Sequence, residues 1–133
     1  KYLLEAISIE PEHWKSLFQL SQIYYGTGNL DESINLAEDA LKKVPHNIDI
    51  KIHLSLLYIL QNRISDSGNL MLDILSENGK NKIALSIMGY LFYLSGKTEE
   101  AYMYSQKALS MDRELPMAKR VMEFLRNDLN SDA

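Results

Sequence analysis

The sequence predicts an all-α protein built as an α-solenoid, a stack of antiparallel helix pairs. Residue types recur every 34 positions along the 133-residue chain, and a fixed period of this length is typical of stacked helical repeats. Within each period, apolar residues follow the spacing of one helix face. Residues that end a helix divide each period into two helices joined by a turn. The clearest periodic series holds Leu20, Leu54, Met88 and Met122.

The period divides the chain into a partial repeat, three full repeats and a closing segment. Residues 1–13 are predicted to be the second helix of a truncated repeat. The full repeats cover residues 14–47, 48–81 and 82–115, and residues 116–133 form a capping helix and a tail. By length this is one domain. Because the chain begins without Met and inside a predicted helix, we expect it to be a fragment of a longer protein.

The first full repeat shows both helices and the break between them. Gly and Asn in residues 26–30 end the first helix, since both tolerate the backbone of a helix C-terminus. Asp31 is the expected N-cap of a second helix over residues 32–43, and Pro45 follows its end. The core face of the first helix consists of Leu17, Leu20, Ser21 and Tyr24.

The second and third repeats vary this pattern. The second has a turn near residues 61–64 and a second helix over 65–77 that contains Gly68. An interior Gly costs about 1 kcal/mol relative to Ala, so we expect this helix to be the weakest. The third repeat has its turn at residues 95–97 and its second helix over 98–111.

The closing helix, over residues 116–128, keeps the spacing but becomes polar. Glu123 takes the register position of a small residue in the earlier repeats, and Arg126 takes that of an aromatic residue. A terminal helix of this kind is expected to be a solvating cap. The polar tail over residues 127–133 is expected to fray.

These residues resemble the tetratricopeptide repeat, whose motif combines a Leu-Gly pair, a Tyr, spaced Ala residues and a closing Pro. In the first repeat Ser21 replaces the Gly and Ser33 replaces the first Ala, and the second repeat is degenerate. The resemblance implies a right-handed solenoid whose small residues let neighbouring helices approach closely. The first repeat matches the motif at Leu17, Leu20, Tyr24, Ala40 and Pro45.

Composition and motifs argue against several function classes. A net charge of −4 argues against nucleic acid binding, and no apolar run of about 18 residues could span a membrane. The chain has no Cys, and its three His are not at metal-ligand spacing. No catalytic motif is present. We therefore predict a protein that is not an enzyme and has no cofactor or metal ion. The compartment stays open, with the cytoplasm favoured and an upstream targeting sequence not excluded.

The resemblance implies that the first helices line a concave groove. This inner face is apolar, whereas a solvated helix face should be polar, and an exposed apolar stripe usually marks a binding surface. Two alternatives stay open: the inner residues bury one another, or more of the parent chain covers them. The predicted groove residues are Phe18, Gln22, Tyr25, Ile52, His53, Leu56, Ile59, Ile83, Tyr90, Tyr93 and Arg120.

The groove predicts a protein or peptide partner with an apolar or amphipathic segment. Some tetratricopeptide domains hold the C-terminal carboxylates of chaperones with Lys, Asn and Arg at inner positions. None of those positions carries a fixed cation here, which argues against such a carboxylate clamp. The main prediction is thus a non-catalytic binding module or scaffold. The alternatives are a homo-oligomerisation module, forming a homodimer, and the regulatory arm of a larger multidomain enzyme. The clamp positions hold Phe18, Gln22, His53, Ile83 and Ile87.

Overall fold

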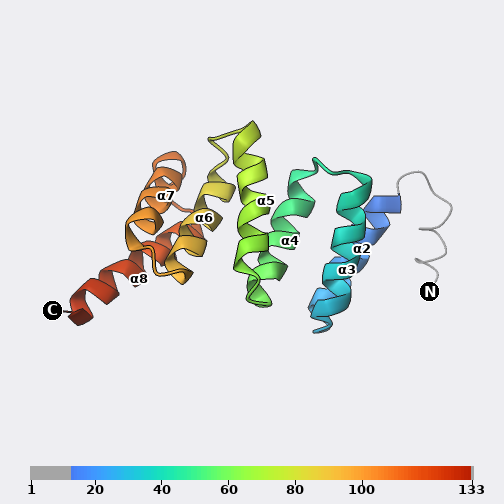
Figure 1. Ribbon diagram of the computed structural model, residues 1–133, viewed down its shortest axis with the longest axis horizontal. Coiled ribbons are helices and arrows are strands. Elements are labelled where there is room, and N and C mark those ends of the chain that lie inside the picture. The colour runs from blue at the N-terminus through green and yellow to red at the C-terminus, as the bar shows by residue number, and fades with distance from the viewer. Residues whose placement is uncertain (1–12, 133) are drawn as a thin grey trace. The chain divides into compact units, whose positions relative to one another are not determined.

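The computed structural model describes residues 13–132, which form seven α-helices joined by short turns (Figure 1). No strand occurs within this range, as the sequence predicts. The helix predicted over residues 1–13 lies outside the described residues apart from His13, which begins the first labelled helix. The helices are α2 (His13–Gly26), α3 (Leu30–Lys43), α4 (Ile48–Leu60), α5 (Ile64–Glu77), α6 (Lys82–Leu94), α7 (Thr98–Met111) and α8 (Pro116–Asp132).

The turn inside each helix pair repeats the 34-residue period in its backbone conformation. Gly28, Asn62 and Gly96 have φ values of 85°, 62° and 79°. This left-handed conformation is strained for most residues, but Gly and Asn adopt it at low cost. The three predicted turns are therefore confirmed, and each one sends the following helix back along its predecessor.

Asparagine caps mark the starts of the second and third pairs. The Asn47 side chain accepts a hydrogen bond from the Ile50 N–H at 2.9 Å, and the Asn81 side chain accepts one from the Ala84 N–H at 3.0 Å. Each bond satisfies one of the backbone N–H groups that a helix start leaves without a partner. The sequence prediction missed both caps, although the two Asn residues are 34 positions apart.

Two predicted helix boundaries are wrong. Asp31 is not an N-cap, because α3 begins at Leu30 and Asn29 occupies the cap position without a side-chain bond. Asp31 lies instead in the first turn, where the helix dipole favours an acidic side chain. The closing helix also does not end at residue 128, since α8 continues to Asp132.

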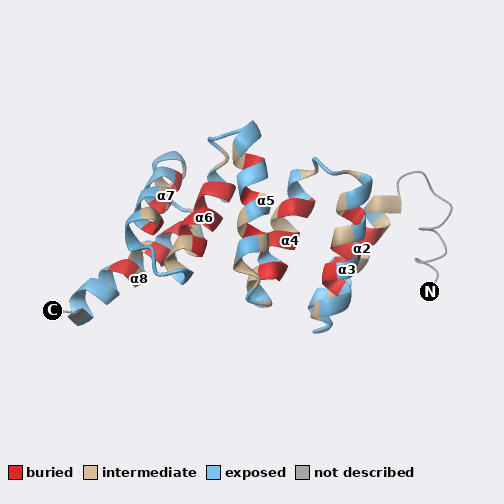
Figure 2. Ribbon diagram, in the orientation of Figure 1, coloured by how far each residue is buried: buried red, intermediate tan, exposed pale blue. Residues whose placement is uncertain are grey.

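The chain divides into two compact units, Lys1–Ser67 and Gly68–Ala133, which are described separately. In the first unit α2 packs against α3, and α3 packs against α4. Half-buried Trp14 and Tyr24 cover the cluster at the centre of this packing. Buried residues fall within these helices, while the turns between them are mostly exposed (Figure 2). The cluster consists of Leu17, Leu36, Ala40 and Ile50.

In the second unit α6 packs against α7 and α8, and these two helices also pack against each other. Two small clusters fill the space between them, and each contains at least one fully buried Ala. Because Ala has the smallest apolar side chain, the helix axes can approach closely at these points. The first cluster is Leu85, Ala108 and Ala118, and the second is Ala101, Val121 and Leu125.

In each of the first two helix pairs, small residues lie where the two helices of the pair contact each other. The Ser21 hydroxyl donates to the Ser33 carbonyl at 2.6 Å, and the Ser33 hydroxyl donates to the Ser21 carbonyl at 2.7 Å. At the same register, the hydroxyls of Ser55 and Ser67 share a hydrogen bond of 2.6 Å. All four side chains are fully buried, so these bonds satisfy groups that water cannot reach.

The third pair replaces this serine contact with Gly89 and Ala101. A Cβ atom on Gly89 would collide with the Ser105 hydroxyl and lie 3.3 Å from the Ala101 carbonyl oxygen. Only Gly fits here without displacing α7. Gly68 is different, because a Cβ there would lie 3.8 Å from the Leu91 side chain, an ordinary contact distance.

We expect the two glycines to respond in opposite ways to alanine. Gly68→Ala should raise the free energy of unfolding by about 0.4–1 kcal/mol, because Ala favours the helix and restricts the unfolded chain. Gly89→Ala should lower it by about 1–3 kcal/mol through overpacking. Urea denaturation followed by circular dichroism measures both. Equal effects of the two substitutions would contradict this packing.

Candidate functional site

In the first unit the predicted groove residues lie on α2 and α4. Tyr25 and Leu56 are exposed over 52% and 38% of their surface. Gln22 is also exposed, whereas Ile52 and Ile59 are half-buried. The face thus presents large apolar side chains to solvent, with one amide beside them.

Phe18 and His53, the other two predicted groove residues of this unit, contact each other. Their ring centroids are 5.3 Å apart in an edge-on arrangement, and Phe18 also packs against the core cluster. The His53 Nε2 atom lies 2.9 Å from the Ser21 hydroxyl oxygen. Because Ser21 and Ser33 both donate their hydroxyl protons to backbone carbonyls, His53 must be the donor. It therefore ties α4 to the serine contact of α2 and α3.

In the second unit the predicted groove residues differ widely in exposure. Ile83 is 42% exposed, and Arg120 is exposed. Tyr90 and Tyr93 are half-buried against the cluster of Ala101, Val121 and Leu125. Ile87, which the sequence placed at a clamp position, is a core residue with 2% exposure.

The Tyr93 side chain is held from two sides by α8. Its ring stacks on Phe124 with centroids 5.3 Å apart, and its hydroxyl donates to the Asp128 carboxylate at 3.1 Å. Burial raises the pKa of Tyr93, and the bond to Asp128 adds to the effect. Of the predicted groove residues, Tyr25, Leu56 and Ile83 therefore remain the most exposed apolar ones.

Metal-binding clusters and membrane-spanning helices were not found in the part of the chain that the structure describes. Within residues 13–132, no group of three or more His, Asp or Glu side chains is placed to hold a metal ion. No helix in this range combines the length and the apolar character needed to cross a membrane.

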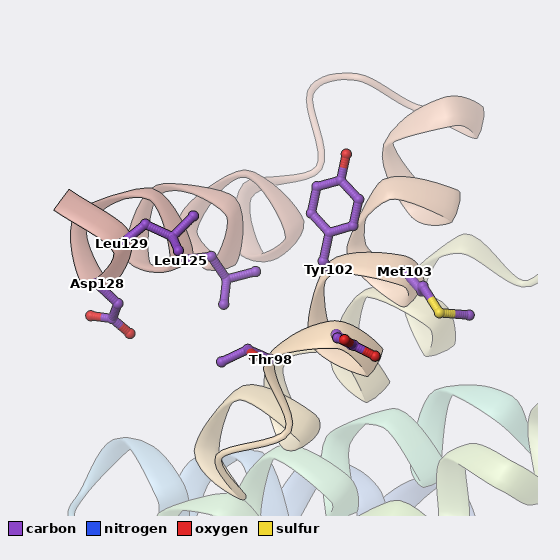
Figure 3. A pocket seen from close by; sticks show the side chains of 7 residues that line it. Thr98, Tyr102, Met103, Leu125, Asp128 and Leu129 are labelled. Carbon is purple, nitrogen blue, oxygen red and sulfur yellow. The ribbon is translucent and has the colours of Figure 1, made fainter. Parts of the chain in front are cut away.

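The sequence prediction missed a hollow of about 500 Å³ between α7 and α8 (Figure 3). The exposed apolar residues that line it are Tyr102, Met103 and Leu129. A signal was present in the register, since Tyr102 and Met103 stand 34 positions after Gly68 and Asn69. Two large apolar residues thus replace a small and a polar one.

The comparisons with known proteins identify the family. The family model described as "Tetratricopeptide repeat" matches residues 15–42. The first TPR of Spaghetti (RPAP3) bound to HSP90 peptide SRMEEVD has a TM-score of 0.77 at 17% identity, over 88% of this chain and 93% of that one. A tetratricopeptide repeat protein from Parabacteroides merdae has a TM-score of 0.83 at 22% identity, over 96% of this chain and 52% of that one. The chain is a tetratricopeptide repeat protein. Its fold is an all-α helical-repeat solenoid, as the sequence predicts.

A relative is similar to this chain over most of its length. The DnaJ homolog subfamily C member 7 homolog of Schizosaccharomyces pombe is 28% identical over 134 residues, which covers 89% of this chain. The chain spans 28% of that relative's length. Tetratricopeptide repeats are protein-interaction modules and are generally non-catalytic scaffolds, so the chain is an interaction module.

The buried position of His53 gives a pH dependence. Burial lowers the pKa of His53 from its ordinary value of 6.5, so its neutral form stabilises the folded state fully above pH 6.5. As the pH falls below 6.5 toward the lowered pKa, the unfolded chain takes up the proton more readily. We expect the free energy of unfolding to fall over this range, measured by urea denaturation at each pH.

Substitution of His53 tests whether this residue causes the decline of the free energy of unfolding at low pH. His53→Gln keeps an N–H donor for Ser21 but does not titrate, so the decline should become shallower. The assignment is wrong if His53→Gln leaves the pH dependence unchanged.

Proposed function

We propose that this tetratricopeptide repeat chain is a non-catalytic binding module. It holds an apolar or amphipathic segment of a partner protein against the inner faces of its first helices. The observation that carries the proposal is the exposure of Tyr25 and Leu56 on the first unit, at 52% and 38%. Exposed large apolar side chains that gather on one face mark an interaction site more often than a solvated face.

The chemistry of this face favours an apolar ligand over an acidic one. Covering each half-exposed side chain contributes roughly 1 kcal/mol, so a few such contacts suffice for a specific complex. Gln22 is the exposed polar group among them and can orient a peptide backbone by hydrogen bonding. The structurally similar first TPR of Spaghetti is described as bound to an HSP90 peptide, so the same fold holds a peptide in that protein.

Phe18 and Tyr90 are poor probes of binding, because both pack against buried clusters. Tyr25 and Ile23 form a better matched pair. Both lie on α2, and their exposed fractions are 52% and 55%. Two residues of helix turn one side chain by about 200° relative to the other, so Ile23 points away from the proposed binding face.

The test begins with peptides selected from a displayed random library on the intact chain. We expect them to carry apolar residues at helical or alternating spacing. Tyr25→Ala and Leu56→Ala should each weaken their binding about 5- to 10-fold, the loss expected for about 1 kcal/mol of apolar contact. Ile23→Ala should leave it unchanged. Fluorescence anisotropy measures the affinities, and equal sensitivity of Ile23 and Tyr25 would reject this binding face.

The peptide SRMEEVD serves as the negative probe in the same assay. The clamp positions carry no fixed cation, so this acidic peptide should show no saturable binding. Saturable binding that Tyr25→Ala does not weaken would mean a different site and ligand class.

Light scattering tests the alternative function of homo-oligomerisation. Light scattering over a wide concentration range should give a constant mass near the monomer's 15.3 kDa. A mass that rises to that of a dimer, and falls back in Leu56→Glu, would assign the inner face to a second copy of the chain.

A further inference from the structure

We propose that the hollow between α7 and α8 is a second docking site, which takes a basic amphipathic helix of a partner protein. The site lies wholly within the second compact unit. It is independent of the proposed function of the inner helix faces, because none of its lining residues belongs to the predicted groove. The lining residues are Thr98, Glu99, Tyr102, Met103, Leu125, Asp128 and Leu129.

The hollow has two helical walls with an apolar floor. Leu125 and Leu129 project from α8 toward the side of α7 that carries Thr98 and Tyr102 (Figure 3). Leu125 is buried, whereas Tyr102 and Leu129 are 45% and 73% exposed. On α7 the lining residues fall at positions i, i+1, i+4 and i+5, and on α8 at i, i+3 and i+4, so each set lies on one side of its helix. A trough between two such stripes suits the apolar face of a third helix.

A local departure from the repeat creates this hollow. At the corresponding positions one repeat earlier, Gly68 lies next to Leu91. A Cβ atom built on the glycine would be 3.8 Å from the leucine methyl carbon. The residues 34 positions later are Tyr102 and Leu125, and these two line the hollow. The tyrosine adds a large side chain at a position where the earlier helices meet closely. The lining of the hollow thus includes a residue that differs from its counterpart in the second repeat.

The charges at the rim of the hollow determine which kind of partner helix it favours. Glu99 and Asp128 are the charged groups among the lining residues, and no Lys, Arg or His is present in that set. The hydroxyl of Tyr93 donates to Asp128 at 3.1 Å, which holds this carboxylate in place. A Lys or Arg on the incoming helix would complement both acids. Because the chain itself has a net charge of −4, electrostatics disfavours a second copy as the occupant.

The test uses two synthetic amphipathic peptides of about four helical turns. They share a Leu stripe at helical spacing and differ in carrying either Lys or Glu beside it. Fluorescence anisotropy with the full chain should show at least tenfold tighter binding of the Lys peptide. Leu129→Glu and Met103→Glu should each weaken that binding at least tenfold. The control Leu94→Glu changes a leucine of the same unit that is 45% exposed and lies outside the hollow, and it should have no effect.

A charge exchange makes the test specific. Glu99→Lys should weaken binding of the Lys peptide and strengthen binding of the Glu peptide. Tyr25→Ala, on the inner face, should change neither, so the two proposals can fail separately. Equal binding of both peptides, equal effects of Leu129→Glu and Leu94→Glu, or a concentration-dependent dimer that Leu129→Glu abolishes would overturn the proposal.

Discussion

The close contact between the two helices of each pair is the constraint on which the rest of the structure depends. Only very small side chains stand there: Ser21 with Ser33, Ser55 with Ser67, and Gly89 with Ala101. A larger residue would push the helices apart and open the clusters beside them, because protein interiors tolerate little change in volume. In the two serine pairs the hydroxyls are also satisfied without water, which makes a polar residue acceptable at a fully buried position.

The same contact positions part of the candidate binding face. His53 forms a hydrogen bond with Ser21, and its ring lies edge-on to Phe18, so α4 is fixed to the serine contact of the preceding pair. This arrangement buries Phe18 and His53 in part and leaves Tyr25 and Leu56 exposed. The residues available to a partner are thus those that the helix contact does not use.

The 34-residue period predicted the helices of the described residues and the turns within each pair, but not the start of α3 or the end of α8. Helix α7 has the predicted bounds of Thr98–Met111, and the turns fall at Gly28, Asn62 and Gly96, because Gly and Asn adopt the left-handed backbone at low cost. The extent of exposure could not be predicted in the same way. Ile83 and Ile87 are one helical turn apart, yet the first is 42% exposed and the second 2%, and only the packing of neighbouring helices decides between them.

Two features of the structure depend on contacts between residues that are separated in the sequence. Ser21 and Ser33 each depart from the repeat motif when taken alone, but the structure shows that the two departures bond to each other. The hollow between α7 and α8 likewise arises because Tyr102 occupies the position that corresponds to Gly68. In both cases the residues can be read from the sequence, but their role follows only from their contacts in the structure.

A double-mutant cycle at Ser55 and Ser67 tests the central claim most directly. Either Ser→Ala substitution leaves the other hydroxyl buried without its partner, which costs about 1–3 kcal/mol. Replacing both removes the polar groups together, much as the third pair does with Gly89 and Ala101. We expect the double variant to unfold with a loss well below the sum of the two single losses, measured by urea denaturation. Strictly additive losses, or no loss in either single variant, would show that the serine contact does not hold the helix pair together.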